Sequence, residues 1–349
     1  SDLYALGLML WELWQGERPW KPQPCNDMEA AIREQWALRS QPIVAKHPAL
    51  SPAERILEKV LRSVLQVDRE QRPHAGQEVA ARLKLSLHPE LARRFEPTPG
   101  SMAERLRRTP MLLLAALVIF LPNVAASVFN YWYNWWRMAE LKSVIPTIES
   151  DFKLVADWVN GIVFPLGGVL FLLMMVPTWK LVCKGAEGAE VSAKEMDWLW
   201  NIGKLATLIC VFLWVTSEVV FAGAFAWMHG GQFQADDAFH FFMSLFLCGG
   251  VAAIYPYFGM TLLAVLLYYP QVVAPRMIDV DFDRRAARLL RDSTHYLLWA
   301  AGIPLTAVAL LVLREQVVRG YVLLGTAVTL VGLLAAFDAH RRLERGIRE

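Results

Sequence analysis

The chain has 349 residues, of which 55% are hydrophobic and 14 are tryptophan, and its formal net charge is +2 at pH 7. This apolar content exceeds that of an ordinary soluble domain, and the near-neutral charge points to no particular class of partner, nucleic acid included. Almost every long apolar run lies after Pro110, so we expect a soluble part over residues 1–109 and a membrane-embedded part after it.

The cysteines and the N-terminus limit the class of protein further. Cys25, Cys183, Cys210 and Cys248 show no paired spacing, and three of them lie in or beside apolar runs. We therefore expect buried thiols and neither disulfides nor a metal site. The first residues read as the middle of a helix, with no initiator Met or signal peptide, so we expect the chain to begin inside a larger protein.

Four helices are predicted in the soluble part. The first, Ser1–Gln15, has an almost continuous apolar face, which indicates a buried helix, and Gly16 is a natural terminator. Ser51 and Glu54 have the spacing of a capping box at the start of a helix that runs to Leu65. The other two helices are expected at Met28–Leu38 and Ala75–Leu85.

Two motifs in this part resemble the protein-kinase C-lobe. Residues 1–20 are similar to its central buried helix, with the pattern S-D-x-Y-x-L-G-x-x-L-x-E-L-x-x-G-x-x-P-aromatic. Residues 61–75 are similar to its late motif, a leucine-ended helix followed by D-P-x-x-R-P-S-A. The motifs occur in the family's order, and the departures from its pattern are Arg69 in place of Pro and His74 in place of Ser.

The resemblance implies roles for three residues. Asp2 would brace the backbone of the catalytic loop, Gly7 would permit close helix packing, and Arg72 would form a buried ion pair with the Glu that ends the activation segment. From the residues alone, Asp2 also reads as an N-cap and Arg72 as a surface residue of a turn.

Phosphoryl transfer also needs a Gly-rich loop, a Lys–Glu pair, a catalytic Asp and Asn, and a metal-binding Asp. None of these occurs before residue 20, and the D-F-D string at 281–283 lies beyond four expected spans. We therefore expect no catalytic residue and no cofactor in this chain. The resemblance implies ATP and Mg, and protein substrates, for a full-length parent.

Six apolar runs are long enough to be read as membrane spans. The fourth is too long for one straight span, and Pro256 near its middle predicts a kinked or tilted helix, with a re-entrant pair as the alternative. Residues 88–109 are expected to be a juxtamembrane linker and residues 338–349 a tail. The spans are expected at Pro110–Phe129, Val155–Thr178, Gly203–Met228, Phe239–Tyr269, Tyr296–Leu313 and Tyr321–Phe337, with a tight link at Arg314–Gly320.

The flanking charges predict the orientation, because Lys and Arg are retained on the cytoplasmic side. One set of flanks is rich in basic residues: Arg105, Arg107, Arg108, Lys180, Lys184, Lys194, Arg276, Arg284, Arg285, Arg288, Arg291, Arg341, Arg342, Arg345 and Arg348. The opposite loops carry fewer: Arg137, Lys142, Lys153, Arg314 and Arg319. Six spans with both termini in the cytoplasm satisfy every flank.

Polar residues in the membrane part are the candidate site. Asn123, Asn130 and Asn134 share one helical face, which predicts packing on another helix, with Asn160 as a contact, or a ligand-sensing surface. Around them, the aromatic segment 129–136 reads as an interfacial belt. Glu218 is the only carboxylate deep in a span, and we expect it to be hydrogen-bonded to Ser217, Thr216 or a neighbouring helix.

The expected fold is therefore all-α, with a partial kinase C-lobe over residues 1–87 and a bundle of about six spans over residues 110–337. The expected function is the C-terminal portion of an inner-membrane Ser/Thr protein kinase, in which the bundle and the outer loop Asn130–Asp151 anchor or sense, with the bilayer and a second copy as partners. The alternatives are a pseudokinase scaffold and a six-span transporter or channel with a kinase-like regulatory domain.

Overall fold

A computed structural model of the chain describes residues 2–21, 27–49, 51–73, 75–232, 235–274, 281–313 and 319–348. Within these ranges every regular element is a helix, which confirms the all-α prediction for the part described. Cys25, His74, Arg276 and Arg314 lie outside the described residues. The chain divides between Leu106 and Arg107 into two compact units, and each is described by itself.

Two helix ends in the first unit form where capping chemistry predicts them. Gly16, with φ 74°, ends the first helix, and its N–H donates to the Glu12 carbonyl at 2.8 Å. Ser51 and Glu54 form the expected capping box, with hydrogen bonds of 3.1 and 2.8 Å. The elements are α1 (Asp2–Gln15), α2 (Met28–Arg39), α3 (Pro52–Val64), η1 (Arg69–Gln71), α4 (Gly76–Ser86), α5 (Pro89–Phe95) and α6 (Met102–Arg108).

The core of this unit is built around α3. Val60 and Leu61, on two faces of that helix, belong to two buried clusters, one with α4 and α5 and one with α1. Ala92 of α5 is fully buried in the first cluster. The expected linker at residues 88–109 is therefore partly a folded element, because α5 contributes to the core.

Helix α1 is not the buried helix that its sequence predicts. Only Gly7, Trp11 and Gln15 are buried, on the face that meets α3. On the other side Met9 is 58% exposed and Leu13 is 81% exposed. The apolar pattern runs around the helix, but the described residues cover one side of it.

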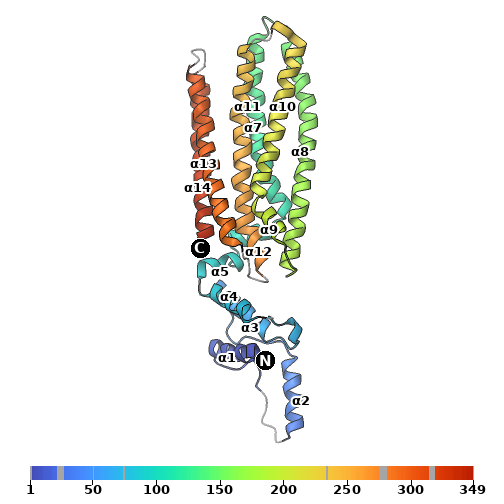
Figure 1. Cartoon of the computed structure of the whole chain (residues 1–349), viewed down its shortest axis with the longest axis vertical. Coiled ribbons are helices and arrows are strands. Elements are labelled where there is room, and N and C mark those ends of the chain that lie inside the picture. The colour runs from blue at the N-terminus through green and yellow to red at the C-terminus, as the bar shows by residue number, and fades with distance from the viewer. Residues whose placement is uncertain are drawn as a thin grey trace. The chain divides into compact units, whose positions relative to one another are not determined.

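The second unit is a bundle of long helices. In Figure 1, α7 (Met111–Leu141), α8 (Ile148–Ala186), α10 (Ile202–His229) and α11 (Ala235–Leu262) run side by side, with α13 (Phe282–Leu313) and α14 (Arg319–Arg348) paired next to α11. The short helix α9 (Ala193–Trp200) joins α8 to α10, and the 3-10 turn η2 (Gly230–Gln232) follows α10.

Four of these helices are long and apolar enough to cross a membrane, judged over the described residues. They are Met111–Leu141, Ile148–Ala186, Ile202–Gln232 and Phe239–Val273. The expected fifth and sixth spans fall on α13 and α14. Many side chains of these two helices and the link between them lie outside the description, so the count of six stays a prediction.

The fourth apolar run is one continuous helical course. Helix α11 carries Pro256 inside it and continues through a π-helical segment, η3 (Leu263–Tyr268), into α12 (Tyr269–Val273). The re-entrant alternative does not describe this region, because no break in the helix separates Phe239 from Val273.

The expected outer loop Asn130–Asp151 is mostly helical, so that prediction is wrong. Helix α7 runs on to Leu141, α8 begins at Ile148, and only residues 142–147 connect them. The helices persist because Met138, Ile145 and Ile148 are buried together with Phe152, Phe225 and Phe241 in one cluster at this end of the bundle. The aromatic segment also divides, since Trp132 and Trp136 are exposed while Tyr131 and Trp135 pack on that cluster.

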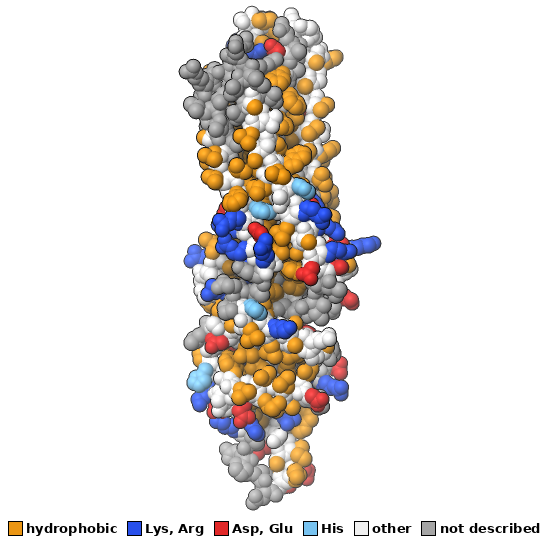
Figure 2. Space-filling model, turned by 60° about the vertical axis from the view of Figure 1, so that its left-hand side comes forward, with side chains coloured by type: hydrophobic (Ala, Val, Ile, Leu, Met, Phe, Trp, Pro, Cys, Tyr) orange, Lys and Arg blue, Asp and Glu red, His pale blue; other side chains and the backbone are white. Residues whose placement is uncertain are grey.

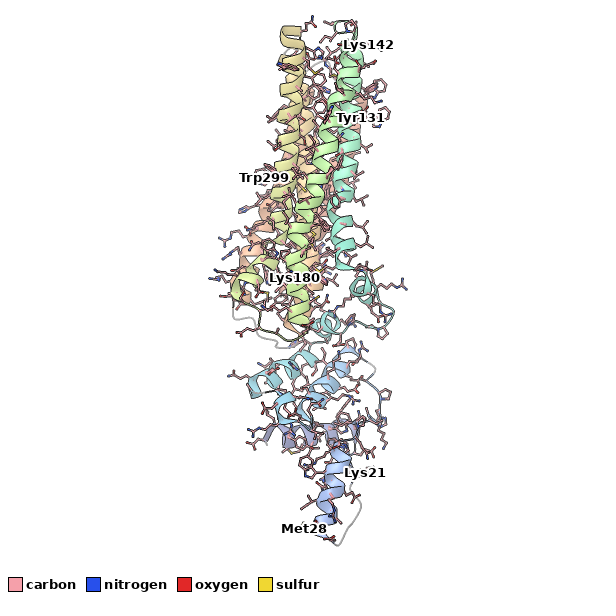
Figure 3. The ribbon with its side chains drawn as sticks, turned by 90° about the vertical axis from the view of Figure 1, so that its right-hand side faces the viewer. Lys21, Met28, Tyr131, Lys142, Lys180 and Trp299 are labelled. Atoms are coloured by element: carbon pink, nitrogen blue, oxygen red, sulfur yellow. The ribbon has the colours of Figure 1, made fainter. Side chains whose placement is uncertain are left out.

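Basic residues gather at the opposite end of the bundle. Figure 2 shows an apolar flank that gives way to a band of Lys and Arg, and Figure 3 shows Lys142 and Lys180 far apart along the bundle. Not every basic residue in these flanks is exposed, because Arg285 is buried and bonds Oδ1 of Asp197 at 2.8 Å. The exposed members of the band include Lys180, Lys194, Arg284, Arg288, Arg341 and Arg345.

Candidate functional site

A cavity of about 120 Å³ lies between α7, α8 and α10, with Phe241 of α11 closing one part of it. Most of its wall is aliphatic or aromatic, and Tyr131, labelled on α7 in Figure 3, is one of the lining residues. Seven polar side chains also face it: Asn123, Ser127, Asn130 and Asn134 from α7, Asn160 from α8, and Ser217 and Glu218 from α10. Apolar walls with a few polar groups are typical of sites that bind small molecules.

Asn123, one of the residues that line the cavity, ties three helices together. Its Nδ2 donates to the carbonyl of Ile119 at 2.7 Å and to that of Ala252 on α11 at 3.2 Å. Its Oδ1 accepts the indole N–H of Trp214 on α10 at 2.9 Å. The amide is therefore satisfied by neighbouring helices, as a polar side chain at membrane depth requires.

Asn130 and Asn134 form a second network with α11. Asn134 Nδ2 donates to Oδ1 of Asn130 at 3.2 Å and to Oγ of Ser244 at 3.1 Å, and Ser244 Oγ also donates to Asn130 Oδ1. These bonds leave the Oδ1 atom of Asn134 buried with no hydrogen-bond partner among the described residues.

Glu218 lies close to the middle of α10, and its side chain faces the cavity. Its Oε1 atom is buried and has no hydrogen-bond partner in the part of the chain that the structure describes. The expected bond from Ser217 is not made, since the Ser217 hydroxyl donates to the Leu213 carbonyl at 2.6 Å. A serine in a helix readily bonds the carbonyl four residues back, and this local bond leaves Glu218 Oε1 unsatisfied.

The sequence placed the three α7 asparagines on one face, and the structure brings all three to the cavity. This face bonds α10 and α11 through Trp214 and Ser244. Asn160 lines the same cavity, but no hydrogen bond in the described ranges joins it to Asn123, Asn130 or Asn134. Ser127 was missed, although its spacing of four from Asn123 puts it on the same face.

A polar layer closes the end of the bundle near residue 137. Arg137 on α7 bonds Oδ1 of the buried Asp237 at 2.7 and 3.1 Å, and it also bonds Glu140 at 2.9 Å. The ring of His240 stacks on Tyr133, with ring centroids 4.2 Å apart. This guanidinium is therefore already neutralised by carboxylates of its own layer and does not serve Glu218.

The kinase-motif residues lie in the first unit. Gly7 faces α3 so closely that a methyl group there would come within 2.8 Å of Val64 Cγ1, whereas Asp2, the first residue of α1, is exposed. Arg72 donates to the carbonyls of Gln66 and Val67 at 2.6 and 3.1 Å, and its guanidinium lies 4.6 Å from the ring centroid of Tyr4. Arg72 thus joins the turn after α3 to α1.

No group of three His, Cys, Asp or Glu side chains with the arrangement of metal ligands occurs in the described ranges. Cys210 and Cys248 are buried and Cys183 is half-buried, all three as free thiols. Comparison with known proteins found no match among family models, curated proteins or solved structures.

Proposed function

We propose that the chain is the C-terminal portion of a membrane-anchored Ser/Thr protein kinase, with the kinase lobe in the cytoplasm and the helical bundle as its anchor and sensor. The parent would use ATP and Mg and phosphorylate proteins. The bundle would have six spans with both termini in the cytoplasm, an orientation supported by the exposed basic residues at one end.

The observation that carries the proposal is the two-sided apolar character of α1. A helix that is apolar all round is normally buried on all sides. Here one side packs on α3 through Gly7 and Trp11, while Met9 and Leu13 on the other side are exposed. The resemblance supplies a partner for this second side, namely the upstream portion of a kinase lobe.

A pair of substitutions tests this assignment directly. Leu13→Glu should leave the stability of this chain almost unchanged, because the side chain is already 81% exposed. In the full-length parent, the same change should place a charge in the lobe core and abolish phosphorylation of a protein substrate. Glu12→Gln, on the same helix, is the matched control. Retained kinase activity in the Leu13→Glu parent would contradict the proposal.

The sensing role has its own test. Deletion of the residues after Arg108 in the full-length parent should give a soluble kinase that no longer responds to membrane composition. Unchanged regulation would count against a sensory bundle. A folded parent without phosphotransfer activity would instead identify the pseudokinase scaffold.

One observation favours a second function, a transporter or channel. Glu218, whose Oε1 atom is buried, lines a cavity inside the bundle, and acidic groups at membrane depth often mark solute or ion pathways. Solute flux in liposomes that is abolished by Glu218→Gln would favour this function over an anchor.

A further inference from the structure

Two residues that line the cavity between α7, α8 and α10 each carry a buried oxygen atom that accepts no hydrogen bond from the described residues. The two atoms are Oε1 of Glu218 and Oδ1 of Asn134. A buried polar atom without a hydrogen bond destabilises the folded state, and a charged group without one does so more strongly. Hydrogen-bond donors carried by a bound molecule would satisfy both acceptors.

The two acceptors lie at different levels of the bundle. The bond from Trp214 to Asn123 sets α10 and α7 in register, with Glu218 one turn beyond Trp214 and Asn134 three turns beyond Asn123. At 1.5 Å per residue, the acceptors are separated by roughly 10 Å along the bundle. The cavity is thus elongated, and a single small ion does not satisfy both ends.

The lining also carries an unbalanced charge. No Lys, Arg or His is among the described residues that line the cavity, so Glu218 has no cationic partner there. Arg137 is bonded to Asp237 and Glu140, and Lys204 pairs with Asp292. A carboxylate at this depth needs a cation or a proton, and the described residues supply no cation to it.

The wall supplies the other half of the recognition chemistry. Phe120, Phe152, Phe164, Phe171 and Phe221 surround the polar groups, so the cavity presents much more apolar than polar surface. A row of water molecules alone would find no hydrogen-bond partners along these phenylalanine walls. For comparison, a dry engineered cavity of about 150 Å³ binds benzene, so about 120 Å³ suits an alkyl chain of similar size.

We propose that this cavity binds a small linear amphiphile with a protonated primary amine, whose ammonium group pairs with Glu218 and whose alkyl chain lies along the phenylalanine wall. The Oδ1 of Asn134 would accept a donor carried at the far end of a longer natural ligand. The proposal concerns binding only and does not depend on the kinase assignment.

The test uses the full chain in lipid nanodiscs and a photoreactive primary alkylamine with a diazirine on its chain. Mass spectrometry of the labelled protein should place the label on α7, α8 and α10 residues of the cavity wall. Hexylamine should compete with the probe, whereas hexanol should compete at least tenfold more weakly. Glu218→Gln, which preserves the shape of the side chain, should weaken labelling at least tenfold.

Two further variants keep the outcome interpretable. Ser127→Leu fills the cavity from α7 and should block the amine and the alcohol alike. Thr216→Val changes an exposed residue on α10 that does not line the cavity, and it should bind as the unaltered chain does. Thermal unfolding of each variant establishes that it is folded.

Two results would overturn the proposal. Labelling spread over lipid-facing surfaces, with none specific to the cavity wall, would show that the cavity is not a binding site. Equal competition by hexanol and hexylamine, unaffected by Glu218→Gln, would show that no ammonium group is recognised. Because neither measurement involves phosphorylation, failure here leaves the kinase proposal untouched.

Discussion

The indole N–H of Trp214 on α10 donates to Oδ1 of Asn123 on α7 at 2.9 Å, while the Nδ2 atom of the same asparagine donates to the Ala252 carbonyl on α11. One side chain therefore fixes the relative register of three helices. This junction lies in the wall of the cavity, and its strength can be measured separately from ligand binding.

We predict a measurable coupling between Asn123 and Trp214. Interhelical hydrogen bonds in membranes average about 0.6 kcal/mol and reach about 1.7 kcal/mol. A double-mutant cycle with Asn123→Ala and Trp214→Phe, followed by unfolding in mixed micelles, should give a coupling free energy in this range. Trp132→Phe, at an exposed tryptophan, is the control and should show no coupling to Asn123→Ala. Strict additivity of the first pair would contradict the prediction.

Gly7 should tolerate no side chain. A Cβ atom there would come within 2.8 Å of Val64 Cγ1 and 3.2 Å of Leu65 Cδ2, whereas at Gly76 the nearest atom is Leu3 Cδ2 at 3.9 Å. Gly7→Val should therefore destabilise the first unit by about 1–3 kcal/mol more than Gly76→Val does, because overpacking costs about that much. Hydrogen exchange of the α1 and α3 peptides measures the difference. Equal protection in the two variants would show that α1 can move away.

Arg285 should contribute to the attachment of α13. Its side chain is 4% exposed and bonds Asp197 Oδ1 at 2.8 Å and the Ala193 carbonyl at 3.3 Å. Arg285→Met should cost about 1–3 kcal/mol, less than a fully buried pair, because Asp197 is 38% exposed. Arg284→Met, at an exposed neighbour, should cost under about 0.5 kcal/mol. Thermal unfolding of both variants in the same detergent gives the comparison, and equal losses would refute a special role for Arg285.

Glu195 should retain its charge at unusually low pH. The Lys184 ammonium, bonded at 2.8 and 2.9 Å, and the Ser192 bonds lower the pKa of Glu195 from its ordinary value of 4.5 to about 2. Because the folded-state pKa is the lower one, its stabilising contribution is complete above about pH 4.5 and is lost as the pH falls through about 2.

The ¹³C resonance of the Glu195 carboxyl group, followed by NMR in micelles, measures this titration. Lys184→Met should move the midpoint upward, towards 4.5, while Lys180→Met should leave it in place. An unchanged midpoint in Lys184→Met would mean that the Ser192 bonds alone hold the pKa down.

Local signals in the sequence predicted much of the fold. The Ser51–Glu54 capping box and the terminator Gly16 mark helix ends by short-range hydrogen bonds, so a single sequence suffices to locate them. The long apolar runs also indicated membrane helices from a single sequence, because the length and composition of each run are local properties. The expected spans are shorter than the helices at this end of the bundle, because α7 continues past Phe129 to Leu141 and α8 begins at Ile148, before Val155. Met138, Ile145 and Phe152 are buried together there.

The site was only half predictable. The spacing of Asn123, Asn130 and Asn134 puts them on one face, but which helices that face meets depends on long-range packing. The hydrogen bonding of Glu218 was also not predictable from spacing. The sequence suggested a bond from Ser217, but in the structure the Ser217 hydroxyl donates to the Leu213 carbonyl. Competition between a local carbonyl and a neighbouring carboxylate is decided by rotamers, which spacing does not reveal.

The π-helical segment Leu263–Tyr268 makes the helix from Phe239 to Val273 behave as if one residue had been inserted into it. A residue inserted or removed elsewhere between Pro256 and Val272, where no widened turn absorbs it, would turn every later side chain by about 100° around the axis. Val272 now lies against Gly185 at the end of α8, where an added methyl would come within 2.8 Å of the Val272 backbone. That fit exists in only one rotational phase, so the length of the chain between Pro256 and Val272 is as constrained as its composition.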